Sequence, residues 1–280
     1  DVAQVQRLLD QAPELANCAP WPGFDGRPLE GVSGGCVWHR PQNKQLAELL
    51  LETGAEADIT VAARAGLIDR VRQLLDDDPT LIDASDENGR TAIYRAGCVY
   101  GFFPEGEAVV DLLLEHGAQL DFFVACTFAM VEDAERMLTD DPSLATKTDP
   151  DGMTCLHWAI RHRRSNGPKR PVAVTKMLLK TGANVHARNQ QEEQMQPIHH
   201  CGEWMAYTQQ VDLLLEHGAD IQPDWYHAFT TWGSIQDAGR VWPSSDLKSL
   251  NDRVTLLRSL VAYTEKVAGS YSPGQAVTDS

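Results

Sequence analysis

The sequence repeats itself at an interval of 63 residues, and this feature constrains the fold more than any other. Three phrases, DGRPLEGV, NGRTAIYRA and DGMTCLHWA, align on Gly26, Gly89 and Gly152, which are 63 residues apart each time. A second set of phrases, LLDQAPEL, LLDDDPTL and MLTDDPSL, recurs at nearly the same interval. Repetition on this scale is typical of proteins built from stacked supersecondary units.

Each repeat carries the apolar pattern of short amphipathic helices. Val71, Leu74 and Leu75 fall at positions i, i+3 and i+4, and the same spacing recurs over residues 110–114. The glycines that follow the last leucine of such a stretch are suited to ending a helix in the left-handed conformation. They are Gly54, Gly117, Gly182 and Gly218. A pair of helices this short cannot bury its apolar stripe alone, so the pattern predicts an all-α protein of stacked helix pairs.

These phrases resemble the ankyrin repeat, which combines a T-P-L-H-x-A helix start with a Leu-Leu-x-x-Gly-Ala helix end. The segment GMTCLHWAI, followed by KMLLKTGANVHARN, carries the resemblance most clearly. The resemblance extends from about Val2 to about Tyr263. It implies a helical solenoid of about seven helix-pair units, in which each 63-residue interval holds one short and one long repeat.

We expect a single solenoid domain over residues 1–265, with an incomplete first unit, followed by a flexible tail at 266–280. No apolar run approaches the roughly 20 residues that cross a bilayer, and no secretory signal is present, although a native start can lie upstream of Asp1. The six cysteines are widely scattered, which favours reduced thiols and a cytoplasmic location. The net charge of −16 disfavours binding to nucleic acid or to an anionic membrane.

The stretch QPIHHCGEW contains two adjacent histidines that the resemblance assigns to different roles. His199, like His157, occupies the histidine position of the motif, which usually bonds to neighbouring backbone and fixes the start of the helix. His200 occupies the variable position, for which the family implies an outward-facing side chain in a concave groove. We therefore expect His157→Ala to reduce stability and His200→Ala to leave it nearly unchanged.

The long repeats carry insertions between their two helices, and these are rich in aromatic residues. The inserted segments are SGGCVWHRPQNKQ, GCVYGFFPEGEA, RHRRSNGPKRPVAV and GEWMAYTQQ, with a further one near the C-terminus. Insertions at a common register lie on one edge of a solenoid, often on its binding side. Clustered aromatic residues there indicate a recognition surface or a pocket, while packing of the loops into a small second core is the alternative. The predicted ligand-binding residues are Trp38, Tyr94, Arg95, Tyr100, Trp158, Arg161, Trp204 and His227.

Two functional hypotheses remain open from the sequence. The first is a recognition protein that binds a protein partner through its groove and inserted loops. The second is a cofactor-independent acid/base enzyme, namely an isomerase, a dehydratase or lyase, or a hydrolase, acting on a small oxygenated or anionic substrate. Its candidate catalytic residues are His200, Glu203, His162 and His39.

Other chemistry finds little support in the sequence. No Walker loop, dinucleotide fingerprint, G-x-S-x-G or H-E-x-x-H motif occurs, so no cofactor is expected. The histidine doublet lacks the paired spacing of a zinc site, and no metal is predicted. The basic segment 161–170 suits a carboxylate or phosphate group, although a solvated loop that balances nearby acids is an equally good interpretation.

Overall fold

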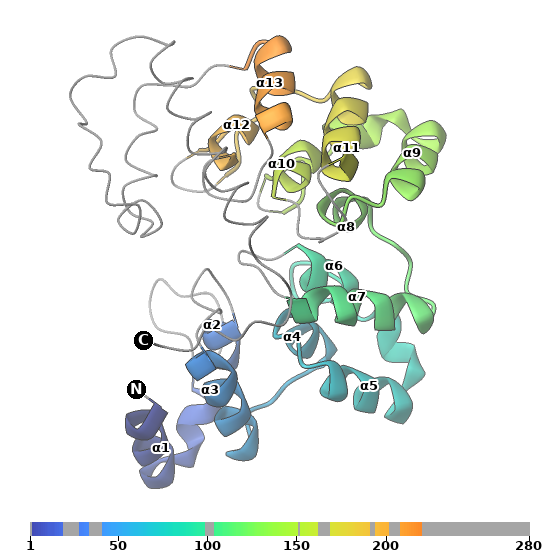
Figure 1. Ribbon diagram of the computed structural model, residues 1–280. Helices are drawn as coiled ribbons and strands as arrows, with labels where there is room; N and C mark the ends of the chain where they lie inside the picture. Colours follow the sequence, from blue (N-terminus) through green and yellow to red (C-terminus); the bar gives the residue numbers. More distant parts are fainter. Residues whose placement is uncertain are drawn as a thin grey trace, which may run out of the picture. The chain divides into compact units, whose positions relative to one another are not determined.

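The computed structural model describes residues 2–18, 28–33, 41–98, 104–150, 152–161, 169–190 and 194–219 (Figure 1). Its elements in chain order are α1 (Val2–Gln11), η1 (Pro13–Asn17), α2 (Pro28–Ser33), α3 (Pro41–Glu52), α4 (Ile59–Arg64), α5 (Ile68–Asp77), η2 (Pro79–Asp83), α6 (Ala92–Gly97), α7 (Pro104–Glu115), α8 (Phe122–Thr127), α9 (Val131–Asp140), η3 (Pro142–Thr146), α10 (Cys155–Ile160), α11 (Lys169–Lys180), α12 (Pro197–His200) and α13 (Thr208–Glu216).

All regular elements of the described residues are helical, which confirms the predicted all-α class of stacked, ankyrin-like helix pairs. The strand-like pairing in this part of the chain consists of two isolated bridges, Ser85 with Thr91 and Thr148 with Thr154. These bridges are themselves 63 residues apart, so the sequence repeat is also a structural one. No helix in the described ranges has the length and apolarity needed to cross a bilayer.

The helices of the short repeats begin at aspartates in equivalent positions. The Asp58 carboxylate accepts hydrogen bonds from the backbone N–H groups of Thr60 at 2.8 Å and Val61 at 2.9 Å at the start of α4. Asp121 does the same at the start of α8, where Phe123 N–H donates to its carboxylate at 2.7 Å. Because the first N–H groups of a helix have no partner within it, these acids fix where both helices begin.

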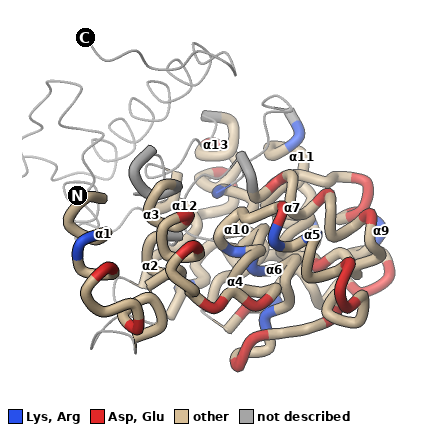
Figure 2. Tube along the Cα trace, turned by 90° about the horizontal axis from the view of Figure 1, so that it is seen from below, with Lys and Arg blue, Asp and Glu red and all other residues tan. Residues whose placement is uncertain are grey.

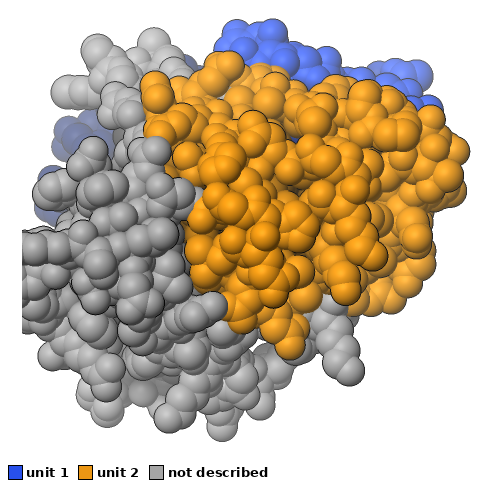
Figure 3. All heavy atoms as spheres, turned by 90° about the horizontal axis from the view of Figure 1, so that it is seen from above, with its two compact units in different colours: residues 1–124 blue, residues 125–280 orange. Residues whose placement is uncertain are grey.

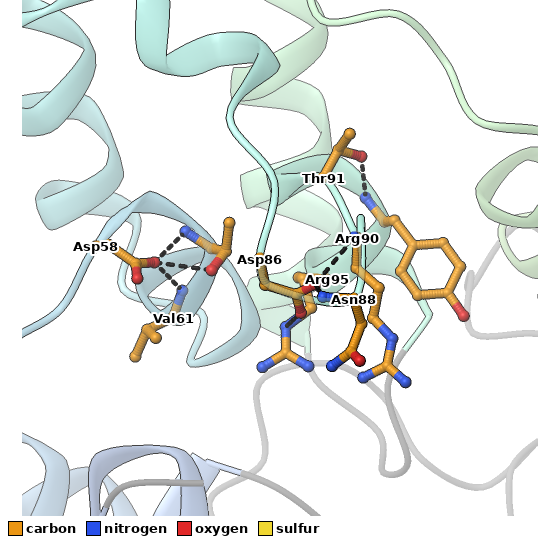
Figure 4. A network of polar contacts seen from close by, with 9 residues as sticks. Asp58, Val61, Asp86, Asn88, Arg90, Thr91 and Arg95 are labelled. Carbon is orange, nitrogen blue, oxygen red and sulfur yellow. Dashed lines mark hydrogen bonds and ion pairs between the residues drawn. The ribbon is translucent and has the colours of Figure 1, made fainter. Parts of the chain in front are cut away.

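Each long repeat is preceded by a hairpin that an acid or amide residue closes. The Asp86 backbone N–H donates to the Arg90 carbonyl at 3.0 Å, and Arg90 N–H donates to the Asp86 carboxylate at 2.9 Å (Figure 4). Asp149 makes the same pair of bonds with Met153, at 2.9 Å and 2.8 Å. A third hairpin runs from Asn189 to Met195 and closes in the same way, although it is two residues longer.

The chain divides into two compact units, residues 1–124 and 125–280, and the division falls within α8 (Figure 3). In the first unit, α4 packs against α5 and α6, and α6 packs against α7. In the second, α10 packs against α11 and α12, and α11 packs against α9 and α13. The single domain over 1–265 stays a prediction. The predicted tail, 266–280, lies outside the described residues.

Acidic residues recur on the second helices of the short repeats, and this surface gives both units a negative face (Figure 2). Asp78 and Asp141, again 63 residues apart, each cap the short helix that follows by accepting bonds from Thr80 and Ser143. The hydroxyl and backbone donors lower the pKa of both carboxyl groups. These acids therefore have a local structural role.

The hairpin glycines provide a matched test of the stacking within the second unit. Gly89 and Gly152 have φ values of +73° and +71°, which a side chain rarely adopts, but their surroundings differ. A Cβ at Gly89 would meet nothing within 4 Å, whereas one at Gly152 would lie 2.6 Å from Gln190 Cγ and 2.9 Å from Gln190 N. We expect Gly89→Ala to cost about 1 kcal/mol for its backbone conformation alone. Gly152→Ala should cost at least about 1 kcal/mol more, because the next hairpin must move. Urea denaturation of both variants measures the difference, and equal losses would contradict the close approach of Gly152 to Gln190.

Candidate functional site

The motif histidine of α10 joins two successive repeats in the second unit. His157 Nδ1 accepts a hydrogen bond from the backbone N–H of Thr154, the residue that precedes the helix, at 3.0 Å. The other ring nitrogen, Nε2, therefore carries the hydrogen and donates to the Met195 carbonyl at 3.1 Å. Since Met195 closes the next hairpin, the imidazole fixes both the start of α10 and the position of the following repeat. The predicted structural role of His157 is confirmed.

His199 plays the corresponding part at the start of α12. Its Nδ1 accepts a hydrogen bond from the Gln196 backbone N–H at 3.1 Å, and the side chain is buried. The register that placed both histidines on the same motif position is therefore correct, even though α12 has a single turn.

The expectation that His200 faces outward is wrong. The residue is 1% exposed, and its ring lies edge-on to that of His157, with the ring centroids 5.5 Å apart. Because α12 packs against α10, the variable position points onto the neighbouring helix start. His200→Ala should therefore also reduce stability, contrary to the sequence-based expectation.

The other variable positions that the structure describes are buried as well. The Trp158 indole N–H donates to the Asp149 carboxylate at 2.8 Å, and the Arg161 guanidinium carbon lies 5.3 Å from the centroid of the Trp158 ring. Trp158 and Arg161 are 0% and 1% exposed. The expected outward orientation of these side chains is wrong, because the hairpin acid draws the indole into the core. Their assignment as ligand-binding residues stays a prediction.

The first unit repeats this arrangement with different side chains. Arg95 is equivalent to Trp158, and its Nε lies 3.6 Å from the carboxylate of Asp86, the hairpin acid equivalent to Asp149 (Figure 4). Tyr94, at the motif histidine position, is buried and packs edge-on against Phe123 with ring centroids 6.2 Å apart. The sequence analysis missed Asp86 and Asp149, although both stand first in the phrases DENGRT and DPDGMT, five residues before the threonine.

Burial sets the protonation state of the histidine cluster formed by His157, His199 and His200. It lowers the pKa of His157 to about 3, with a further contribution from the positive potential of His200 and Arg161. The pKa of His199 also falls to about 3, chiefly through burial, with smaller effects from His200 and Arg188. Burial and then Arg161 hold the pKa of His200 well below its usual value. All three imidazoles are therefore neutral near pH 7.

A buried amide ties the last described helix to the repeat before it. The Gln210 side chain on α13 donates to the Ala159 carbonyl at 3.1 Å and to the Thr175 hydroxyl oxygen at 2.8 Å. These bonds connect α13 to both helices of the preceding long repeat. They hold α10, α11 and α13 together at the ends of the two connections 162–168 and 202–207.

The remaining candidate residues fall in segments outside the described residues. They are Trp38, His39, Tyr100, His162, Glu203, Trp204 and His227. Among the described residues, no three histidine, cysteine or acidic side chains gather closely enough to hold a metal ion. In the basic segment, Arg170 pairs with Glu132 of α9 at 3.2 Å across an exposed surface.

The described helices nevertheless show where the inserted segments begin and end. Each segment leaves the chain at the end of the first helix of a long repeat and returns at the start of the second helix. The four connections are residues 34–40, 99–103, 162–168 and 202–207. The predicted common register of the insertions is therefore confirmed along the chain.

Comparison with known proteins supports the repeat assignment over part of the chain. The family model of the ankyrin repeat matches residues 151–190, which contain α10, α11 and their hairpin. No curated protein matches the sequence.

Solved structures that are similar to the chain include the Bd0816 predatory endopeptidase from Bdellovibrio bacteriovorus in complex with immunity protein Bd3460. The identity is 18%, the match covers 69% of this chain and 99% of that chain, and the TM-score is 0.33. At that score the likeness supports no conclusion about this chain.

Proposed function

We propose that the chain is a recognition protein that binds a protein partner through the connections between the helices of its long repeats. One observation carries the proposal. The four connections share one register, and the polar and aromatic side chains described at the helix starts are occupied within the fold. The ankyrin-repeat match at residues 151–190 supports the same class of function.

In the second unit, the connections 162–168 and 202–207 supply the residue types that dominate binding energy. They read HRRSNGP and GEWMAY, and so contribute Arg163, Arg164, Trp204 and Tyr207. Tryptophan, tyrosine and arginine are enriched among the few interface residues that carry most of the affinity. We infer that the partner presents carboxylates beside an apolar patch, because guanidinium groups bind carboxylates with two parallel hydrogen bonds.

The neutral state of the histidine cluster argues against the acid/base alternative. A general base works best when its pKa lies near the working pH and when it can reach the substrate. His200, the central candidate, is 1% exposed, and its pKa lies well below its usual value. Its position against His157 fits a packing role better than proton exchange with a substrate.

Affinity measurements with paired variants test this proposal. Once a partner has been captured from the source cells, Trp204→Ala and Tyr207→Ala should each weaken binding about 30-fold, since an aromatic hot spot contributes about 2 kcal/mol. Arg136→Ala is the matched control, because this side chain is 64% exposed on α9 and should not affect affinity. Full affinity in both aromatic variants would refute the proposed surface. A substrate whose turnover is lost in a folded His200→Gln variant would instead favour the enzyme.

A further inference from the structure

The first two elements of the chain are the second half of a short repeat. The phrase LLDQAPEL in α1 and η1 corresponds to LLDDDPTL in α5 and η2 and to MLTDDPSL in α9 and η3. In both later repeats a six-residue helix comes first, α4 before α5 and α8 before α9, and a turn of three residues follows it. The middle residue of that turn is left-handed in both cases, at Gly66 with φ 67° and at Ala129 with φ 51°. The element equivalent to α4 is the one that α1 lacks.

In the complete short repeat, the first helix covers an apolar face of the second. α4 packs against α5, and its residues from Ile59 to Ala63 are all buried. Val71 on α5 is 0% exposed, as is its equivalent on α9, Ala134. Leu74 and Leu81, which continue this side of the repeat, are half-buried.

The equivalent face of α1 is open. Val5 takes the place of Val71 but is only half-buried, while Leu8 and Leu15 are 50% and 38% exposed. In the described part of the chain these two leucines are the large apolar residues that stand exposed. The opposite side of α1 is closed, since Leu9 is 3% exposed and the helix packs against η1 and α3.

We propose that Val5, Leu8 and Leu15 form a docking surface for a short helix of the α4 and α8 kind, supplied by residues directly upstream of Val2 in the native protein. The two examples within the chain define the chemistry of this occupant. Each follows an aspartate that caps it, reads ITVAAR or FFVACT, and ends three residues before the helix that it covers. The occupant is thus a six-residue apolar helix with small residues in its second half, joined to α1 by a three-residue turn.

A graft tests the proposal on the full chain. Residues 57–67, which carry the Asp58 cap, α4 and its turn, are placed directly before Val2 in place of Asp1. Amide hydrogen exchange in α1 should slow at least 10-fold, because residues 2–11 would no longer open independently of a packed neighbour. The matched control is the same graft with Ile59→Asp and Ala62→Asp in the added copy, which should leave exchange in α1 unchanged.

A second pair of variants separates the docking surface from a general effect of the extension. Leu8→Glu with Leu15→Glu should have little effect on the ungrafted chain, because both side chains are exposed there, but should abolish the protection that the graft provides. Equal protection by the control graft would overturn the proposal. So would dimerisation of the ungrafted chain that Leu8→Glu removes, because a second copy would then be the occupant.

Discussion

Replacement of His157 by alanine is expected to lower the free energy of unfolding by about 3 kcal/mol or more. The imidazole accepts the Thr154 N–H and donates to the Met195 carbonyl, and the side chain is 0% exposed. Its loss leaves a buried backbone N–H without its acceptor, at about 1–3 kcal/mol, and opens a cavity beside His200, which adds a cost of similar size. Chemical denaturation followed by circular dichroism measures the change.

His217→Ala is the control for this variant. His217 is also on a helix and also bonds to a backbone carbonyl, with Nδ1 2.8 Å from Leu213 O, but it is exposed. Its replacement should cost less than about 0.5 kcal/mol, as is usual for surface positions. A small and equal loss in both variants would show that His157 does not join the two repeats.

The second large effect is a loss of stability in mild acid. His157 and His199 have a pKa of about 3 in the folded chain, whereas an unfolded chain has histidine pKa values near 6.5. Between these two values the unfolded state binds more protons, so the free energy of unfolding falls as the pH falls. The stability from these neutral histidines is complete above about pH 6.5 and is lost progressively down to about pH 3. From pH 7 to pH 5 each of the two should cost about 2 kcal/mol, and His200 acts in the same direction.

The slope of stability against pH, measured by denaturation at several values between pH 7 and pH 5, tests this expectation. The low pKa values of Asp78 and Asp141 take effect only at more acid pH, so the chosen range isolates the histidines. His200→Gln should reduce the slope, whatever it does to stability at pH 7, because one buried titrating group is removed. A flat profile in the wild-type chain would contradict the buried, neutral cluster.

The repeat architecture could be predicted from the sequence because it depends on local patterns. The glycines at 63-residue spacing, the leucine stripes and the motif histidines each have a fixed place in a helix pair, and the structure confirms these places in the described residues. His157 was assigned correctly because its role is to bond to Thr154, three residues before it, and this bond follows from the motif alone.

The orientation of the variable positions could not be predicted in the same way. Whether Trp158 faces a groove or the core depends on Asp149, which lies nine residues earlier and accepts its indole N–H. The burial of His200 depends on the packing of α12 against α10, a contact between two repeats. A side chain at a helix start can therefore turn outward or back to its hairpin, and the acceptor available in the hairpin decides between these orientations.

Hydrogen exchange of the complex with its protein partner tests the proposed function most directly. The account predicts that peptides covering residues 162–168 and 202–207 become protected when the partner binds, while those covering α9 and η3, residues 131–146, keep their exchange rates. Protection confined to α9 and η3, with both connections unchanged, would contradict it.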